Sequence, residues 1–355
     1  MKIGIVGGGI NGLCVASAAL GKGHEVTLFE RGSLMSETSA NSSKLLHGGL
    51  RYLEQGKFQL VKEALRERKY WLNKSGDLTQ PLRFYLPIYK TSKRSPWMVR
   101  IGLYLYDFLA GKYTIQRHKK EDISQFVKQF PEFNQEDLLV VFSYSDGQMD
   151  DKRLGLLLAE EIKFNGCRVL ENTQVLTLFE DGGLELASGE SYQFDKVINV
   201  AGPWSEALLQ RSNISTQTNL DLIRGSHIII KQSLESGFIL EVPGEDRVFF
   251  VLPHHGKTLV GTTEVRQRID EPIEASQEEK DYLLKAYQHY FDNSASEVNI
   301  VGNYAGVRPL LISHKNPNKA SREYVIEKNG EVITVFGGKW TTSRALGEKL
   351  ARKYL

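Results

Sequence analysis

The feature that most constrains this chain is a glycine-rich turn close to its N-terminus. Gly7, Gly9 and Gly12 form the pattern Gly-x-Gly-x-x-Gly between a short apolar run, Lys2–Val6, and a helical stretch, Gly12–Gly21. In a strand-turn-helix unit such glycines allow the tight turn, let the backbone approach a pyrophosphate, and let the helix pack on the strand. The helix N-terminus offers free N–H groups and a positive dipole to the phosphates. The pattern predicts a dinucleotide site; the alternative is a turn with only a packing role.

A second strand supports the dinucleotide hypothesis. His24–Glu30 is a short run with β-branched and aromatic residues, and it predicts the next parallel strand. The run ends on Glu30, at the distance from the glycines at which an acidic side chain accepts a ribose hydroxyl. Because strand, helix and acidic residue all accompany the glycines, we expect one βαβ unit that binds a dinucleotide.

The C-terminus repeats this order of strand, glycine turn and helix. Val332–Phe336 predicts a strand, Gly337–Lys339 a second loop that approaches a ligand closely, and Thr341–Lys353 a helix. A buried flavin would need such a loop over its ring, which favours FAD over NAD. The alternative is that Thr341 or Thr342 is simply a helix N-cap.

The remaining segments predict a mixed fold. Helices are expected at Lys57–Lys74 and Asp151–Phe164; strands at Arg168–Glu180, Lys196–Ala201, Ile228–Ile230, Val248–Leu252 and Leu259–Thr263; and a hairpin at His254–Lys257. We therefore expect α/β and α+β architecture, in which a discontinuous Rossmann-like FAD-binding domain carries an inserted, mostly antiparallel β substrate domain. The expected bounds are 1–78, 146–208 and 322–355 for the FAD-binding domain, and 79–145 and 209–321 for the substrate domain.

Composition excludes several classes. The 45 basic and 43 acidic residues give a net charge of +2, so no global charge attracts nucleic acid, and no nucleic-acid partner is expected. Cys14 and Cys167 fit neither a disulfide framework nor a metal site, which favours a reducing cytoplasm and no metal. The apolar stretch Ile3–Leu20 is interrupted by glycines, so we expect neither a signal peptide nor a membrane span.

Longer motifs carry a family resemblance over nearly the entire chain. They lie at Gly7–Gly12, Asn41–Glu54, Ser95–Asp107, Asp146–Leu154, Ala201–Trp204, Gly225–Ile228, Gly261–Glu264, Gly306–Leu310 and Phe336–Arg344. The sequence resembles the FAD-dependent glycerol-3-phosphate dehydrogenases and oxidases of the D-amino-acid-oxidase superfamily, most specifically in Ser-Ser-Lys-Leu-Leu-His-Gly-Gly-Leu-Arg-Tyr. Family members look longer, with a helical C-terminal domain, whereas this chain ends at Leu355. Trp340 stands where the family tends to have a smaller apolar residue, which is expected to reshape the pocket beside the flavin.

The resemblance implies a substrate site with several cationic donors. It places Arg51, Tyr52, Arg308 and Lys339 around the substrate, with Thr342 beside them. From charge matching, we expect Arg51, Tyr52 and Lys339 to bind a phosphate dianion. We expect Arg308 to bind the oxygen on the reacting carbon. Arg308 has the alternative of a structural ion pair.

A histidine is the candidate base. His227 has an imidazole that titrates near neutral pH and can take the hydroxyl proton, or else it is a satisfied histidine at a strand edge.

The cofactor site implied by the resemblance is larger. The loop Ser42–Gly49 would cover the flavin, although by composition it is also an ordinary Ser/Gly loop. The expected cofactor-binding residues are Gly7, Gly9, Asn11, Gly12, Glu30, Arg31, Ser42, Ser43, Lys44, His47, Gly48, Gly49, Val175, Ala201, Gly202, Trp204, Gly337, Gly338, Lys339, Trp340 and Thr341.

A basic segment suggests a surface partner. Arg83–Lys120 holds nine Lys or Arg residues against one acid, Asp107, with aromatic and aliphatic residues between them. Such a segment is typical of a surface that rests on an anionic membrane, here the inner face of the cytoplasmic membrane, and that approaches a quinone. The alternative is a solvated basic face over a core helix.

The function implied by the resemblance is oxidation of sn-glycerol 3-phosphate to dihydroxyacetone phosphate by hydride transfer to flavin, with electrons passed to a quinone or another acceptor. The alternatives are an oxidase or dehydrogenase of a 2-hydroxy acid or amino acid, which needs only one carboxylate-binding arginine, and a non-catalytic flavin-binding scaffold.

Overall fold

The computed structural model describes residues 1–291, 298–312 and 324–355. Its helices are α1 (Ile10–Leu20), α2 (Phe58–Lys74), α3 (Pro96–Ala110), α4 (Ile123–Gln129), α5 (Asp151–Phe164), α6 (Ser205–Arg211), α7 (Gln277–Tyr290) and α8 (Ser343–Tyr354). Its strands are β1 (Lys2–Val6), β2 (Glu25–Phe29), β3 (Leu45–Leu46), β4 (Thr79–Tyr89), β5 (Lys119–Glu121), β6 (Leu138–Met149), β7 (Arg168–Leu170), β8 (Val175–Leu178), β9 (Gly183–Leu186), β10 (Ser191–Gln193), β11 (Lys196–Asn199), β12 (Leu220–Ile230), β13 (Gly237–Glu241), β14 (Val248–His254), β15 (Lys257–Gly261), β16 (Val265–Arg266), β17 (Ile300–Leu311), β18 (Tyr324–Asn329) and β19 (Val332–Gly337).

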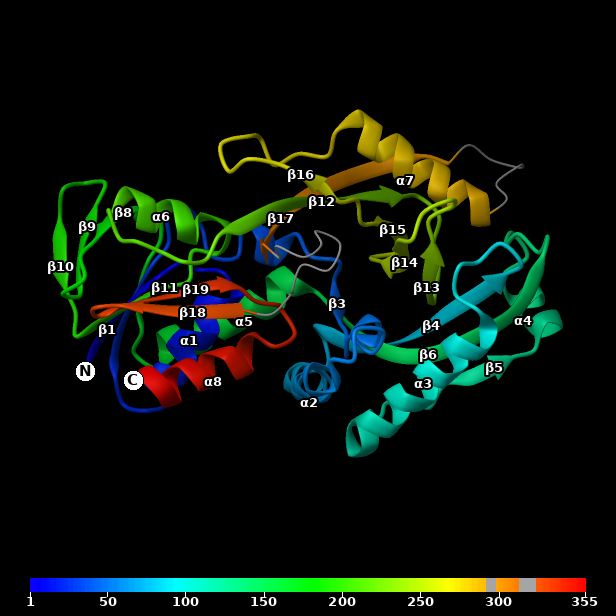
Figure 1. Cartoon of the computed structure of the whole chain (residues 1–355), viewed down its shortest axis with the longest axis horizontal. Helices are drawn as coiled ribbons and strands as arrows, with labels where there is room; N and C mark the ends of the chain where they lie inside the picture. The colour runs from blue at the N-terminus through cyan, green and yellow to red at the C-terminus, as the bar shows by residue number, and fades with distance from the viewer. Residues whose placement is uncertain (292–297, 313–323) are drawn as a thin grey trace.

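A six-stranded sheet joins the two ends of the chain. Its order is β18-β19-β11-β1-β2-β7, and all neighbours are parallel except the β18–β19 pair. Helices α1, α5 and α8 bury Leu13, Leu158 and Leu346 in one core. A second core holds Leu178 and Leu208, from β8 and α6. Both termini lie beside this sheet (Figure 1), so the expected Rossmann-like unit is confirmed.

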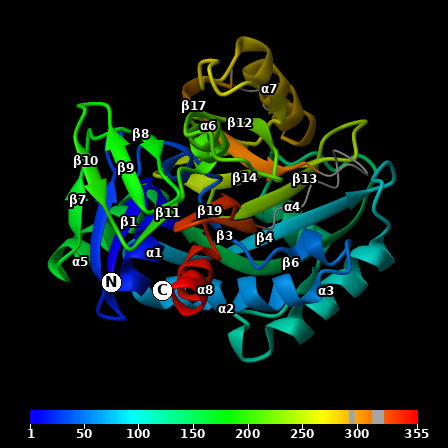
Figure 2. The ribbon, with the colours of Figure 1, turned by 60° about the vertical axis from the view of Figure 1, so that its left-hand side comes forward.

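The second sheet is large and mostly antiparallel. Its order is β16-β12-β15-β14-β13-β4-β6-β3, with β17 on β12 and β5 on β6; the β13–β4 pair is parallel. Phe126 of α4 and Leu283 of α7 lie in one core against it, and Leu65 of α2 and Leu103 of α3 lie in another. Figure 2 shows α7 and α3 on opposite sides of the large sheet.

Several expected elements are confirmed and a few bounds are corrected. The strand at Lys2–Val6, the helix at Asp151–Phe164 and the hairpin at His254–Lys257 are confirmed. Helix α1 begins at Ile10 rather than Gly12, since Gly9 is its N-cap. The stretch Arg168–Glu180 forms two short strands, β7 and β8, with a break between them.

The basic segment is not one amphipathic unit. It contains the end of β4, then α3 with a short 3-10 helix, Gly111–Tyr113, and then β5. Leu82, Phe84, Leu86 and Ile88 of β4 are buried.

The domain bounds stay a prediction. The expected boundary between 145 and 146 falls inside β6, and the boundary between 321 and 322 lies outside the described residues. Strand β3, expected in the FAD-binding domain, pairs with β6 of the large sheet.

Candidate functional site

The two glycine turns meet in space because α1 and α8 pack closely. A Cβ on Gly347 would lie 2.5 Å from the carbonyl oxygen of Cys14, so only glycine permits this approach. At the N-terminal ends of the helices, Asn11 Nδ2 donates to the carbonyl oxygen of Gly337 at 3.4 Å. The strand-turn-helix units at the chain's extremities therefore border one cavity.

This cavity has a volume of about 960 Å³ and is lined by residues of both the six-stranded sheet and the large sheet. That volume is at the upper end of the range for small-molecule and cofactor sites. The predicted site residues that line it are Gly7, Gly9, Asn11, Glu30, Arg31, Ser42, Ser43, His47, Gly49, Arg51, Tyr52, Val175, Ala201, Gly202, Trp204, His227, Arg308, Gly337, Gly338, Lys339, Trp340 and Thr341.

Four predicted site residues do not line the cavity. Gly12 has a packing role, because a Cβ there would lie 1.9 Å from the carbonyl oxygen of Gly7. The Lys44 ammonium is buried in an ion pair with Asp151 at 2.6 Å. Gly48 and Thr342 lie behind the cavity wall.

One end of the cavity is formed by β1, β2 and the turn before α6, and we expect the nucleotide there. The Glu30 carboxylate accepts N–H groups from Gly8 at 2.7 Å and from Gly32 at 2.9 Å. Glu30, which directly follows β2, therefore holds the glycine turn in place. Its side chain also faces the cavity. Arg31 lies over the Trp204 ring, with 3.8 Å between the guanidinium carbon and the ring centroid. This pair offers a flat wall that suits an adenine ring.

Features around the C-terminal glycine turn also fit FAD. Asn11 Oδ1 is buried and, within the described residues, has no hydrogen-bond partner. Gly338 adopts φ +105°, and a Cβ there would lie 2.8 Å from Asn11 Nδ2. Trp340 Nε1 donates to the carbonyl oxygen of Ser39 at 3.1 Å, which ties the C-terminal loop to the opposite wall. The C-terminal turn thus offers backbone to a planar ligand that needs close approach.

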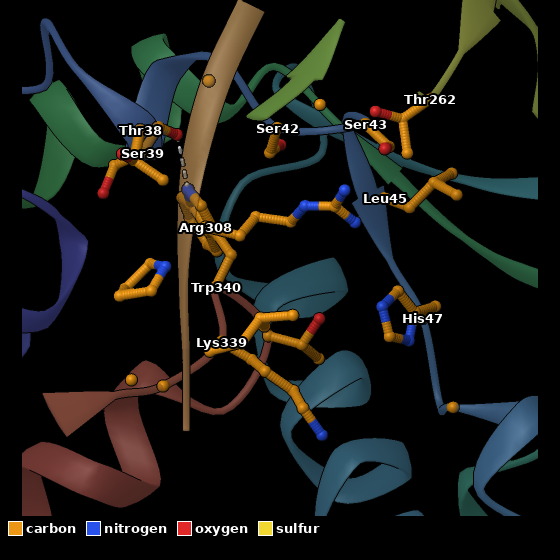
Figure 3. A pocket seen from close by; sticks show the side chains of 18 of the residues that line it. Thr38, Ser39, Ser42, Ser43, Leu45, His47, Thr262, Arg308, Lys339 and Trp340 are labelled. Carbon is orange, nitrogen blue, oxygen red and sulfur yellow. Dashed lines mark hydrogen bonds between the residues drawn. The ribbon is translucent and has the colours of Figure 1, made fainter. Parts of the chain in front are cut away.

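Cationic side chains gather on one side of the cavity. Figure 3 shows Arg308, His47 and Lys339 around one open space, each from a different segment of the chain. The Lys339 ammonium lies 3.7 Å from the centroid of the Tyr52 ring. Arg308 Nη2 donates to the carbonyl oxygen of Thr263 at 2.9 Å, and Nη1 lies 3.6 Å from Glu264 Oε1. Arg308 therefore makes an ion pair and also faces the cavity.

His227 lies in an unfavourable place for a charged imidazole. Its ring stacks on Tyr304, with centroids 4.7 Å apart, and Nε2 lies 3.0 Å from Ser43 Oγ. Burial, assisted by the charges of Arg308 and Lys44, lowers the pKa of His227 to about 3. The imidazole is neutral at physiological pH, and it holds a proton too weakly to be an effective base there.

Sequence reasoning missed an apolar arm of the cavity. Phe84, Leu86 and Ile88 of β4 line it together with Val99 and Leu105 of α3. The alternation of large apolar residues in β4 was the signal available, because such a pattern marks one face of a strand. Whether that face borders a core or a cavity depends on the packing of α3.

Helix α3 also carries an exposed apolar face. Trp97, Ile101, Tyr104 and Phe108 are between 55% and 79% exposed, and the i, i+4, i+7, i+11 spacing places them on one side of the helix. Lys112 follows the helix C-terminus and Arg94 precedes its N-terminus. Within the described residues, no helix is both long and apolar enough to cross a bilayer.

Comparisons with known proteins agree with this geometry. Residues 2–353 match the family model described as FAD dependent oxidoreductase. The chain is 36% identical to D-erythritol 1-phosphate dehydrogenase of Brucella abortus, over 97% of this chain and 72% of that protein. It is 34% identical to the aerobic glycerol-3-phosphate dehydrogenase of Escherichia coli, over 98% of this chain and 72% of that protein.

Solved structures share the fold. A glycerol-3-phosphate dehydrogenase from Bacillus halodurans complexed with FAD has a TM-score of 0.78 and 24% identity, over 99% of this chain and 64% of that one. L-alpha-glycerophosphate oxidase from Mycoplasma pneumoniae has a TM-score of 0.76 and 19% identity, over 100% of this chain and 95% of that one. The chain therefore belongs to the FAD-dependent oxidoreductases that act on CH–OH groups, in the family of the glycerol-3-phosphate dehydrogenases.

Proposed function

We propose that this protein oxidises the secondary alcohol of a small polyol phosphate, with sn-glycerol 3-phosphate as substrate and dihydroxyacetone phosphate as product. The observation that carries the proposal is the placement of Arg308, Lys339 and Arg51 on the wall of the cavity that the two glycine turns border. A phosphate dianion needs several cationic donors, whereas a carboxylate needs only one arginine. Similarity to dehydrogenases of two polyol phosphates supports the same class of substrate.

The protein's share of the chemistry is binding and orientation. FAD supplies the acceptor for the hydride that leaves the carbinol carbon. Residues of the turn Gly7–Gly12 would hold its pyrophosphate, Glu30 a ribose hydroxyl, and the backbone of Gly337–Thr341 its ring. No side chain of the described cavity has to form a covalent bond to the substrate.

The cationic groups have separate tasks. Lys339, held over Tyr52, and Arg51 would bind the phosphate. Arg308, fixed by Thr263 and Glu264, would donate to the oxygen that gains negative charge as its proton leaves. Its guanidinium is preorganised, so little reorganisation is needed during the reaction.

The hydroxyl proton needs an acceptor. The low pKa of His227 argues against that role, and its contact with Ser43 suits a residue that fixes the loop. We assign the proton acceptor to His47, whose ring borders the open space shared with Arg308 and Lys339 (Figure 3). The hydride then leaves from the carbinol carbon, and the proton leaves from the hydroxyl oxygen on that carbon.

Anaerobic mixing tests the function. Purified protein with bound FAD is mixed with sn-glycerol 3-phosphate, D-erythritol 1-phosphate, glycerol, 2-hydroxyglutarate and D-amino acids, and the flavin absorbance is followed. We expect bleaching by sn-glycerol 3-phosphate and none by glycerol. Faster bleaching by D-erythritol 1-phosphate would show that this polyol phosphate is preferred to sn-glycerol 3-phosphate. Bleaching only by a hydroxy acid or amino acid, or by none of these compounds, would refute the proposal.

A membrane surface is the proposed site of electron delivery. The exposed apolar face of α3 lies along the apolar arm of the cavity, because Met98, Ile101 and Leu105 line that arm. Apolar side chains flanked by Arg100 and Lys112 suit the interface of an anionic bilayer. Protein bound peripherally at the inner face of the cytoplasmic membrane would meet a quinone there.

A further inference from the structure

The motif that begins at Asp146 has no part in the chemistry proposed above, yet it borders the loop that carries the site. Strand β3 pairs with β6 through Leu45 with Gln148 and Leu46 with Gly147. Beyond Leu46 the chain leaves the sheet, so the next backbone N–H groups lose their strand partner. The Asp146 carboxylate accepts the N–H of Gly48 at 3.1 and 3.3 Å, which continues the pairing where the strand has ended.

Asp146 is itself fixed by two helices. Arg68 of α2 donates to Oδ1 at 2.8 Å, and Tyr106 of α3 donates to Oδ2 at 3.0 Å. Asp146 and Arg68 are each 1% exposed. A buried network whose carboxylate accepts from three different groups has one favourable geometry, because any shift leaves a buried polar group unpaired.

The glycines of the loop fit this arrangement. A Cβ on Gly48 would lie 2.2 Å from the Tyr106 hydroxyl oxygen, so a side chain there would displace the donor. Gly49 adopts φ +79°, which turns the chain into the short helix Leu50–Tyr52. His47 directly precedes the two glycines, and Arg51 lies two residues after Gly49, within the short helix.

We propose that Asp146 is a positioning residue for the reaction: by holding the backbone at Gly48, it directs His47 and Arg51 into the cavity together. Asp146 itself borders the cavity, but its side chain is 1% exposed and its oxygens accept from Gly48, Arg68 and Tyr106. We therefore assign its effect to the loop, with no contact to substrate. The inference rests on the proposed function for its kinetic consequence. Tyr106 and Arg68 are the groups that hold Asp146 itself.

Kinetics of four variants test this role. Asp146→Asn keeps one acceptor oxygen for Gly48, Asp146→Ala keeps none, and Tyr106→Phe removes one donor without unpairing a charge. Glu67→Gln is the matched control, because Glu67 is a fully buried carboxylate that pairs with Arg344 at 2.8 Å and does not line the cavity. Single-turnover flavin reduction, flavin content and thermal midpoint are measured for each.

We expect kcat to fall in the order native, Tyr106→Phe, Asp146→Asn, Asp146→Ala. A misplacement of the order of 1 Å costs about 10²-fold in rate, which is the loss expected for Asp146→Asn. Flavin content should stay full, and Glu67→Gln should lose stability with kcat within about twofold of native. Asp146→Asn with full flavin and native kcat would overturn the proposal. If Asp146→Asn does not fold, native kcat in Tyr106→Phe would overturn it.

A second measurement separates this proposal from the proposed function. Hydrogen exchange of the amides at 47–52 should be faster in Asp146→Asn than in native protein, and unchanged in Glu67→Gln. If no polyol phosphate reduces the native flavin, the proposed function fails. Hydrogen exchange still tests the contact between Asp146 and the Gly48 N–H. Unchanged exchange at 47–52 in Asp146→Asn would refute the positioning role whatever the substrate.

Discussion

Replacing Gly338 by alanine tests whether the two ends of the chain converge on one flavin. Gly338 has φ +105°, outside the conformations that residues with a Cβ adopt readily, and an added Cβ would lie 2.8 Å from Asn11 Nδ2. Such backbone strain costs about 1–3 kcal/mol. Without FAD the loop can relax and relieve this strain, whereas bound FAD holds the loop in place. The strain therefore weakens FAD binding, and roughly 1.4 kcal/mol corresponds to a tenfold change in Kd. We therefore expect the Kd for FAD to rise by roughly 5- to 150-fold.

The assay is titration of apoprotein with FAD, followed by flavin fluorescence, together with the free energy of unfolding. Gly166→Ala is the matched control: Gly166 has φ +93°, and a Cβ there would meet no atom within 4 Å. Both variants carry similar backbone strain, but Gly166 lies between α5 and β7, outside the residues that line the cavity. A native Kd in Gly338→Ala, or an equal rise in Gly166→Ala, would show that the C-terminal loop does not hold the flavin.

Three further predictions address the substrate site, the buried histidine and the surface. Arg308→Ala should retain FAD but slow anaerobic flavin reduction by sn-glycerol 3-phosphate about 10²- to 10³-fold, the usual loss for one preorganised donor; a native rate would remove Arg308 from the mechanism. Because burial lowers the pKa of His227 to about 3, the neutral imidazole contributes stability above its ordinary pKa of 6.5 that is lost as the pH falls toward 3. Urea unfolding at pH 7, 5.5 and 4.5 should thus show a smaller acid loss for His227→Gln than for native protein, and equal losses would contradict the burial argument. Ile101→Ser combined with Phe108→Ser should weaken binding to anionic vesicles about tenfold or more in co-sedimentation, whereas Phe164→Ser, which removes a 92% exposed side chain from α5, should not; equal effects would argue against a specific membrane face.

Local sequence patterns predicted those helices and strands whose conformation depends mainly on residues nearby in the sequence. The strand Lys2–Val6, the glycine turn and Glu30 follow one another within thirty residues, so their geometry depends mainly on neighbours in the sequence. The hairpin at His254–Lys257 is equally local. The FAD-binding fold and the family were therefore accessible from the sequence.

Long-range packing decided the rest. Whether Lys44 faces a ligand or Asp151 depends on α5, more than one hundred residues later, which supplies the buried carboxylate. The sequence left open whether His227 is a base or a satisfied histidine at a strand edge, because an isolated imidazole titrates near neutrality. Burial against Tyr304 and the charge of Arg308 lower its pKa, and neither can be read from neighbouring residues.

By itself the sequence determined the strand-turn-helix units at the two ends of the chain, because glycine spacing and strand periodicity act over a few residues. Only the tertiary structure decided that Asp146, Tyr106 and Gly48 share one hydrogen-bonded cluster. It also decided that α3 covers an apolar arm of the cavity while exposing Phe108. The physical reason is that burial and desolvation depend on which distant elements pack together. A residue's own neighbours in the sequence do not specify that packing.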